Sequence, residues 1–301
     1  MEGRKWEELN EDCLVKVFEG VGLESLILDV PFVCKSWYKV ALYPGCWKRL
    51  DFRFINLDHQ LSFQNRFIAL YNVINFSCIK FIQLVVRRSR RSATSLVLPI
   101  SLTQNLLDYL ANECSELRQL HLTNFSMSAN ENDSFPDEAN CLSEFVGRFT
   151  YLEELVLVRP SSPIDQTLMQ ISLRCLNLVS FSLQGYLIED DAVAIVTFLP
   201  KIKSLSLKRC VLTRETLLSV IRGCRELEVL SVCNCVGLNI DDEILGMASH
   251  IKTFKFQGCS KNEYEFLGLC GNYIHPKLMQ AHPSIKEYID YFWSRNDGIF
   301  L

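Results

Sequence analysis

The pattern apolar-x-x-apolar-x-apolar occurs six times in this chain of 301 residues, and five of the copies follow one another at nearly constant spacing. The copies begin at Leu117, Leu152, Leu178, Ile202, Leu227 and Ile251. After a first interval of 35 residues the intervals are 26, 24, 25 and 24, and a weaker copy begins at Ala93, 24 residues before the first. A fixed period of this size indicates small structural units that stack in a row and share one core.

A period of roughly 20–29 residues with this pattern is typical of leucine-rich repeats, so we predict an α/β solenoid, a horseshoe arc with one strand and one helix per repeat. In the copy that begins at Ile202, the apolar period changes to two, as a short strand requires. Thr213 to Cys224 predicts a helix with Thr213 as its N-cap, and Gly223 helps to end it. Equivalent helices are expected over residues 104–113, 142–149, 165–174, 190–199 and 241–249.

Four segments are predicted along the chain. They are a compact helical module (1–50), a helical linker or first repeat region (51–92), the leucine-rich repeats (93–270) and a C-terminal capping segment (271–301). The polar run 126–134 predicts a looped insertion within the long first interval. In the last segment, residues 283–293 have the apolar spacing of an amphipathic helix that would cover the end of the stack.

The outward-facing strand positions predict the concave face of the solenoid. They are mostly small and polar, without a dominant charge, so a solvated surface explains any one of them. As a continuous surface they are the best candidate for binding a partner protein. The positions that we select as candidate binding residues are His121, Glu154, Ser182, Ser206, Lys208, Ser231 and Lys255.

Composition and charge exclude several classes of partner. The formal net charge of −4 gives no basic footprint, so neither nucleic acid nor an anionic membrane is expected as a partner. Charged residues interrupt every long apolar stretch, which argues against a membrane span. The charged first eight residues predict no secretory signal, and 13 cysteines without one suggest a reducing compartment, the cytoplasm and/or the nucleus.

The cysteines recur in phase with the repeat, which favours a structural role over chemistry. Three lie three residues before the first apolar position of a copy, and three lie three residues after the last: Cys114, Cys175, Cys224, Cys210, Cys235 and Cys259. Small, weakly polar thiols suit buried corners. Cys233, Cys235, His250 and Cys259 suggest a zinc site, but C-x-C spacing is poor for one and the repeat already explains the positions. No metal or cofactor is expected.

The first fifty residues have a different pattern, that of three short helices. Asn10 would cap the first, and Gly20 and Gly22 would end it. A second apolar stretch stops at Pro31, and the run from Val33 to Ala41 predicts a third helix. Three short helices make a marginal core alone, so this segment is expected either to dock a partner or simply to cap the solenoid.

The order of residues in this module resembles the F-box motif over about residues 4–50. Val33-Cys34-Lys35-Ser36-Trp37, followed by Pro44 and Trp47, is its most specific part. Asn10 departs from the family, which usually has proline after the leucine. With the cysteine-containing repeats, the chain looks like a plant-type F-box/leucine-rich-repeat protein.

The resemblance implies a non-catalytic substrate receptor of an SCF-type ubiquitin ligase. The F-box would bind a Skp-family adaptor, which links it to a cullin–RING ligase, and the repeats would hold an unknown protein substrate for ubiquitination. Mapped onto the motif, the adaptor contacts are Leu9, Leu14, Val17, Val33 and Trp37. Each of these side chains could equally lie inside the helical core.

Two other functions stay open: a co-receptor for a small, hormone-like molecule on the same scaffold, and an interaction scaffold that uses the repeats without an adaptor. The basic cluster 87–91 would bind phosphate or act as a nuclear address, or would be a solvated helix end. No combination of nucleophile, base and orienting residue is recognisable, so no catalytic residue is expected.

Overall fold

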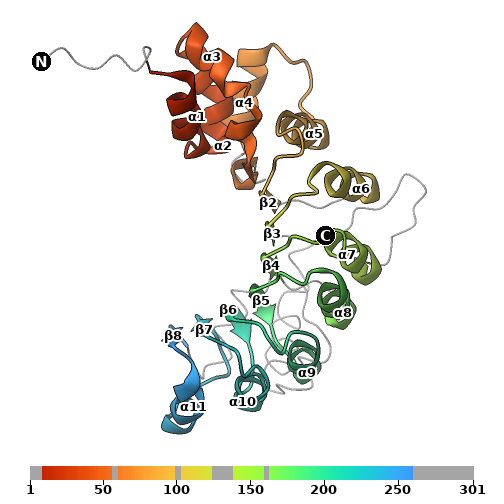
Figure 1. Cartoon of the computed structure of the whole chain (residues 1–301), viewed down its shortest axis with the longest axis vertical. Helices are drawn as coiled ribbons and strands as arrows, with labels where there is room; N and C mark the ends of the chain where they lie inside the picture. Colours follow the sequence, from red (N-terminus) through yellow and green to blue (C-terminus); the bar gives the residue numbers. More distant parts are fainter. Residues whose placement is uncertain (1–8, 56–59, 99–102, 124–137, 159–162, 260–301) are drawn as a thin grey trace, which may run out of the picture. The chain divides into compact units, whose positions relative to one another are not determined.

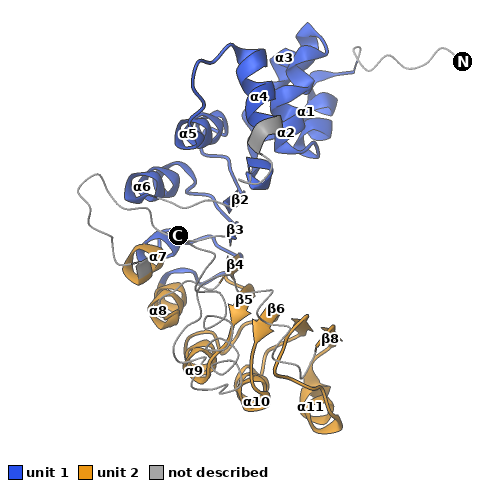
Figure 2. Cartoon of the chain, turned by 180° about the vertical axis from the view of Figure 1, so that it is seen from behind, with its two compact units in different colours: residues 1–137, 144–154, 174–177 blue, residues 138–143, 155–173, 178–301 orange. Residues whose placement is uncertain are grey.

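The computed structural model describes residues 9–55, 60–98, 103–123, 138–158 and 163–259. The predicted insertion at 126–134 and the predicted helix at 283–293 lie outside these residues. The chain consists of two compact units (Figure 2). Unit 1 contains residues 1–137, 144–154 and 174–177, and unit 2 contains the rest.

Within the described ranges, the strands form one eight-stranded sheet with neighbours in sequence order, and every pair with a described register is parallel. This confirms the predicted leucine-rich-repeat fold. The strands are β1 (Arg49–Asp51), β2 (Ser95–Leu98), β3 (Gln119–Leu122), β4 (Glu154–Val158), β5 (Ser180–Tyr186), β6 (Ser204–Val211), β7 (Val229–Cys233) and β8 (Thr253–Gln257).

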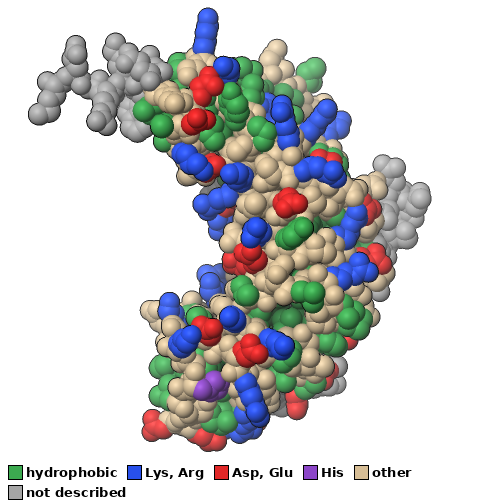
Figure 3. Space-filling model, viewed as in Figure 1, with side chains coloured by type: hydrophobic (Ala, Val, Ile, Leu, Met, Phe, Trp, Pro, Cys, Tyr) green, Lys and Arg blue, Asp and Glu red, His purple; other side chains and the backbone are tan. Residues whose placement is uncertain are grey.

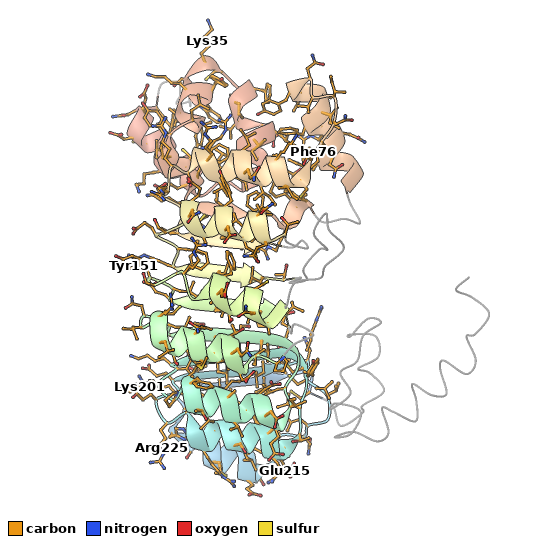
Figure 4. All side chains as sticks on the ribbon, turned by 90° about the vertical axis from the view of Figure 1, so that its right-hand side faces the viewer. Lys35, Phe76, Tyr151, Lys201, Glu215 and Arg225 are labelled. Atoms are coloured by element: carbon orange, nitrogen blue, oxygen red, sulfur yellow. The ribbon has the colours of Figure 1, made fainter. Side chains whose placement is uncertain are left out.

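In each unit, the helices of the repeats lie on one side of the strands (Figure 1). Those of the repeats are α6 (Gln104–Glu113), α7 (Glu138–Val146), α8 (Asp165–Arg174), α9 (Glu189–Phe198), α10 (Arg214–Gly223) and α11 (Asp242–Met247). They agree with the expected ranges to within a few residues. Figure 4 shows α9 and α10 side by side, with Lys201 and Arg225 in equivalent turns along the same edge.

A repeated backbone hydrogen bond sets the register at the start of each strand. In unit 2, the amide of Ser204 donates to the carbonyl of Val179 at 2.9 Å. One repeat later, the amide of Val229 donates to the carbonyl of Lys203 at 2.9 Å. Each repeat therefore supplies the acceptor that places the next, and the leucines in the strands, such as Leu205 and Leu207, are completely buried.

A tight corner follows the last apolar residue of the pattern in each of the four repeats that contain β5 to β8. The residues two positions after the last apolar one have positive φ: Gly185 (118°), Arg209 (51°), Asn234 (53°) and Gly258 (66°). In the repeats of β6 and β7, the next residue is a completely buried cysteine. The thiols of Cys210 and Cys235 each donate, at 3.4 Å, to a carbonyl of the preceding repeat. The predicted structural role of these in-phase cysteines therefore has a specific geometry, a hydrogen bond between repeats.

Two residues of α10 act at its ends. Thr213 is the N-cap, since its hydroxyl oxygen accepts from the amide of Thr216 at 3.1 Å, as predicted. Gly223 was expected to help end the helix, but it is the last helical residue and its φ is not positive. A β-carbon there would lie 2.3 Å from Cγ1 of Val196 in α9. Glycine is therefore required for the close approach of the two helices.

Unit 1 begins with the predicted three helices, α1 (Glu11–Glu19), α2 (Leu23–Leu28) and α3 (Lys35–Ala41). Asn10 caps α1, with its side-chain oxygen accepting from the amide of Asp12 at 3.0 Å. The third helix begins later than expected, because Cys34 is extended (φ −161°) and serves as its N-cap. Val33 therefore precedes the helix instead of forming its first turn.

The linker contains α4 (Gln60–Tyr71) and α5 (Cys78–Arg88), joined by an aromatic core around Phe81. Ring centroids of Phe63, Phe67 and Phe76 lie 5.2, 5.2 and 5.4 Å from that of Phe81. The linker also touches the first three helices, because the hydroxyl of Tyr71 donates to the carbonyl of Ile27 in α2 at 2.6 Å. The three-helix module therefore does not stand alone.

The first strand of the sheet was not predicted. It comes earlier than the first recognised repeat, and its Leu50 aligns with Leu96 of β2. Trp47, Leu50 and Phe52 in fact have the apolar-x-x-apolar-x-apolar spacing and are all buried. Trp47 and Leu50 lie in the predicted helical module and Phe52 in the predicted linker or first repeat region, so this copy of the pattern crosses the predicted boundary.

Candidate interaction surfaces

The helical module exposes apolar side chains between α2 and α3 and on α1. Phe32 and Val33 are 51% and 55% exposed, and Val17 is 41% exposed. Figure 3 shows hydrophobic side chains reaching the surface among charged ones in the part formed by α1–α4. Monomeric proteins rarely leave neighbouring large apolar groups in water without a use for them. The predicted adaptor contacts Val17 and Val33 are therefore accessible to a partner.

The other predicted adaptor residues occupy different environments. Leu14 is completely buried in the core of the module, and Leu9 is half-buried just before the N-cap of α1. Trp37 is half-buried, with its ring edge-on to Phe18 at 5.2 Å between centroids. Its Nε1–H is buried without a hydrogen-bond partner among the described residues. In the chain on its own, Leu14 and Trp37 thus contribute to packing of the module.

An open groove lies beside Val33, between the η2 turn (Val30–Phe32) and α4. Its lining residues are Leu28, Asp29, Phe32, Val33, Arg66, Ala69 and Leu70. The guanidinium of Arg66 binds the Asp29 carboxylate at 2.6 Å, so the groove has apolar walls and one ion pair at its side. Since Leu70 is also well exposed, the apolar surface of the module continues onto the linker.

A polar network fixes the first helix against the third. The Glu11 carboxylate accepts from Nζ of Lys39 at 2.8 Å and from the Tyr43 hydroxyl at 3.0 Å. The bond from Lys39, followed by that from Tyr43, lowers the pKa of Glu11. This network connects the first turn of α1 to α3 and to Tyr43 just after it.

On the sheet, four predicted binding residues of unit 2 form one row. Ser182 pairs with Ser206, Ser206 with Ser231, and Ser231 with Lys255. Lys208 belongs to the next row, opposite Cys233, and it is exposed. The Ser206 hydroxyl is buried without a hydrogen-bond partner among the described residues, so it could form a hydrogen bond with a bound protein. The row thus combines small side chains with a cation at its end.

The two predicted binding residues of unit 1 contact each other. Nε2 of His121 in β3 lies 3.3 Å from Oε1 of Glu154 in β4, without hydrogen-bond geometry. Glu154 also accepts from the side-chain amide of Gln119 at 3.2 Å. This part of the sheet is therefore polar and already partly paired, as the serine row also is at Ser231, whose hydroxyl shares a hydrogen bond with the Cys233 thiol.

The basic cluster 87–91 is partly structural. Arg91 donates to the backbone carbonyl of Asn112 at 2.8 Å, near the end of α6, where helix carbonyls lack partners. The guanidinium carbon of Arg88 lies 5.4 Å from the Trp47 ring centroid, over the ring. Arg87 and Arg90 are exposed. The structure thus gives packing roles to two of the four arginines.

The described residues contain no group of three or more His, Cys, Asp or Glu side chains placed to hold a metal ion. Burial raises the pKa of the Cys224 thiol to about 11 and that of Cys114 to about 12, which keeps both protonated. In the same ranges, no helix has the length and apolar character that crossing a membrane would require.

Comparison with known proteins agrees with this architecture. A family model described as the LRR repeats of FBD-associated F-box protein At5g56370 matches residues 148–248. F-box/LRR-repeat protein 9 of Arabidopsis thaliana is 25% identical over 81% of this chain and 93% of its own length. F-box/LRR-repeat protein At3g48880 and F-box protein SKIP19 from the same plant are 23% and 25% identical, over 76% and 79% of this chain and 72% of each relative.

The repeat match falls on β4 to α11, while the relatives extend over most of the chain. The helical module, the parallel sheet and these similarities agree with one another. The chain is therefore similar to plant F-box/leucine-rich-repeat proteins, in its repeats and over most of its length.

Proposed function

We propose that this chain is a non-catalytic substrate receptor of an SCF-type ubiquitin ligase. Its F-box would bind a Skp-family adaptor, and its sheet would hold a protein substrate. The names of the relatives support an F-box role in general. The observation that carries the proposal is the exposure of Phe32, Val33 and Val17 on the module that resembles an F-box.

The adaptor surface would consist of these exposed side chains together with the groove beside Val33. Burial of three half-exposed apolar side chains provides favourable free energy in proportion to the area removed from water. An adaptor that placed a hydrogen-bond acceptor beside the buried Nε1–H of Trp37 would bind more tightly, because an unsatisfied buried donor is unfavourable by about 1–3 kcal/mol. Leu14 would act indirectly, by keeping the helices packed.

The substrate surface would be the serine row and Lys208 of unit 2, with His121 and Glu154 of unit 1 as further contacts. Small serines allow a partner to approach the strands closely, and Lys208 and Lys255 favour an acidic substrate segment. Such a receptor supplies no catalytic group. It accelerates transfer by holding substrate lysines near activated ubiquitin at high effective concentration.

The adaptor half is tested by changing Val17 and Val33 together to glutamate and measuring affinity for a purified Skp-family adaptor. Both side chains are exposed, so the fold should survive. We expect binding to fall at least about a hundredfold, because unpaired charges buried in an interface are unfavourable by several kcal/mol. Val193→Glu is the matched control, since Val193 is 58% exposed on α9. Equal binding by the double variant and the wild type would refute the assignment.

A further inference from the structure

A largely enclosed cavity of about 120 Å³ lies inside unit 1, and its walls come from α2, α3, α4, α5 and the η3 turn (Pro44–Trp47). Its inner wall is apolar and buried: Leu26, Ile27, Ala41, Trp47, Phe81 and Val85. Its rim is more exposed, with Tyr38, Leu42 and Leu84 each at least 40% accessible. The cavity therefore has an apolar interior and an opening to solvent.

The polar atoms around the cavity are few, and most are already used. The indole Nε1–H of Trp47 donates to the Ala41 carbonyl at 2.7 Å. The Tyr71 hydroxyl donates to the Ile27 carbonyl at 2.6 Å, which leaves its oxygen as an acceptor only. Burial raises the pKa of Tyr71, and the positive charge of Arg88 opposes the rise, so the guanidinium lies close enough to affect this wall.

Arg88 is the charged residue of the lining. Its guanidinium carbon lies 5.4 Å from the Trp47 ring centroid, which fixes the group over an aromatic face. Among the described residues, Arg53 and Arg66 are paired with carboxylates, whereas no ion pair involves Arg88. A guanidinium held by stacking keeps its N–H groups available for a bidentate anion.

We propose that this cavity binds a small aromatic carboxylate, with the ring inside the apolar wall and the carboxylate on Arg88. A cavity of roughly 150 Å³ lined by apolar side chains is known to take up benzene, so one aromatic ring is the right scale for the interior. The single unpaired cation at the lining selects an anionic head over a neutral one. The site is separate from the sheet and does not depend on the proposed ligase function.

The test uses para-fluorophenylacetate as the probe and the full chain, with binding followed by fluorine NMR. We expect saturable binding in the high-micromolar to millimolar range, as suits a ligand with few atoms. Arg88→Met should weaken it at least tenfold, because a charge-assisted hydrogen bond is lost while the side-chain stem still covers Trp47. Arg87→Met is the matched control, since Arg87 is the adjacent arginine and lies outside the cavity lining; it should bind as the wild type does.

Two further measurements distinguish the contribution of the aromatic ring to binding from that of the carboxylate. The neutral para-fluorophenylacetamide should bind more weakly than the acid and be insensitive to Arg88→Met. Ala41→Leu, which fills the buried wall, should abolish binding of both probes while the circular dichroism spectrum stays native. The proposal is overturned if the acid shows no saturable binding, if Arg87→Met weakens binding as much as Arg88→Met does, or if a folded Ala41→Leu protein still binds.

Discussion

Replacing Gly223 by alanine would raise the helix propensity of α10 but would also create a steric clash with α9. In an isolated helix, alanine is more stable than glycine by about 0.5–1 kcal/mol. In this chain, the new β-carbon would lie 2.3 and 2.4 Å from the two γ-carbons of Val196 and 2.9 Å from its β-carbon. The two considerations therefore predict stability changes of opposite sign.

The size of the expected stability change follows from these carbon–carbon distances. Carbon atoms in contact prefer a separation of about 3.5–4.0 Å, so α9 and α10 would have to separate by about 1 Å. Rotation of the Val196 side chain cannot relieve the contact with its β-carbon. Overpacking of this kind is unfavourable by about 1–3 kcal/mol. After subtracting the gain in propensity, we expect Gly223→Ala to destabilise the protein by about 1–2 kcal/mol, measured by urea unfolding followed by circular dichroism.

Gly246→Ala is the matched control, because Gly246 is also helical and a β-carbon there would meet no atom within 4 Å. That variant should be more stable than the wild type by up to about 1 kcal/mol. Combining Gly223→Ala with Val196→Ala should remove most of the clash, so the two changes should be less destabilising together than their sum. The reasoning is refuted if Gly223→Ala stabilises the protein as Gly246→Ala does.

Other predictions concern the ends of α10 and the thiols. Thr213→Ala should destabilise the protein by about 1 kcal/mol in the same unfolding assay, whereas Thr213→Ser should keep the cap; equal values for both would contradict the capping role. Alkylation at pH 8 should modify exposed Cys13 and spare Cys224 until the chain is unfolded, as peptide mass mapping would reveal. The pKa of Cys224 is raised from 9.0 to about 11, so its contribution to stability is full below pH 9 and declines between pH 9 and 11. Unfolding measurements across that range should show the decline, and a smaller one for Cys224→Ala.

The sequence predicts the repeats well because leucine spacing directly reflects strand and helix geometry. The strands and the cap at Thr213 follow from local pattern alone. The first strand does not follow from local pattern, because Trp47 belongs both to the helical module and to the repeat pattern, and only the pairing of Leu50 with Leu96 distinguishes these roles. The left-handed conformation of Arg209 was also not predictable, since arginine does not favour positive φ.

The candidate surfaces were predicted less completely. The outward-facing strand positions follow from strand alternation, and the structure places the serines of unit 2 in one row. Accessibility within the helical module did not follow from the motif, because Leu14 and Val17 lie on the same short helix, and one is buried while the other is exposed. The cavity beside Arg88 joins residues more than forty positions apart, so no local pattern contains it.

The proposed receptor has two separable surfaces, one for the adaptor and one for a substrate. The most direct test is affinity purification with mass spectrometry on three forms of the full chain: wild type, the Val17→Glu/Val33→Glu variant, and a Lys208→Glu/Lys255→Glu variant. We predict that the first variant loses the Skp-family adaptor and the cullin but retains and enriches substrates. The second should keep the adaptor and lose a defined set of proteins. Retention of the adaptor by the first variant, or an unchanged set of partners with the second, would contradict the account.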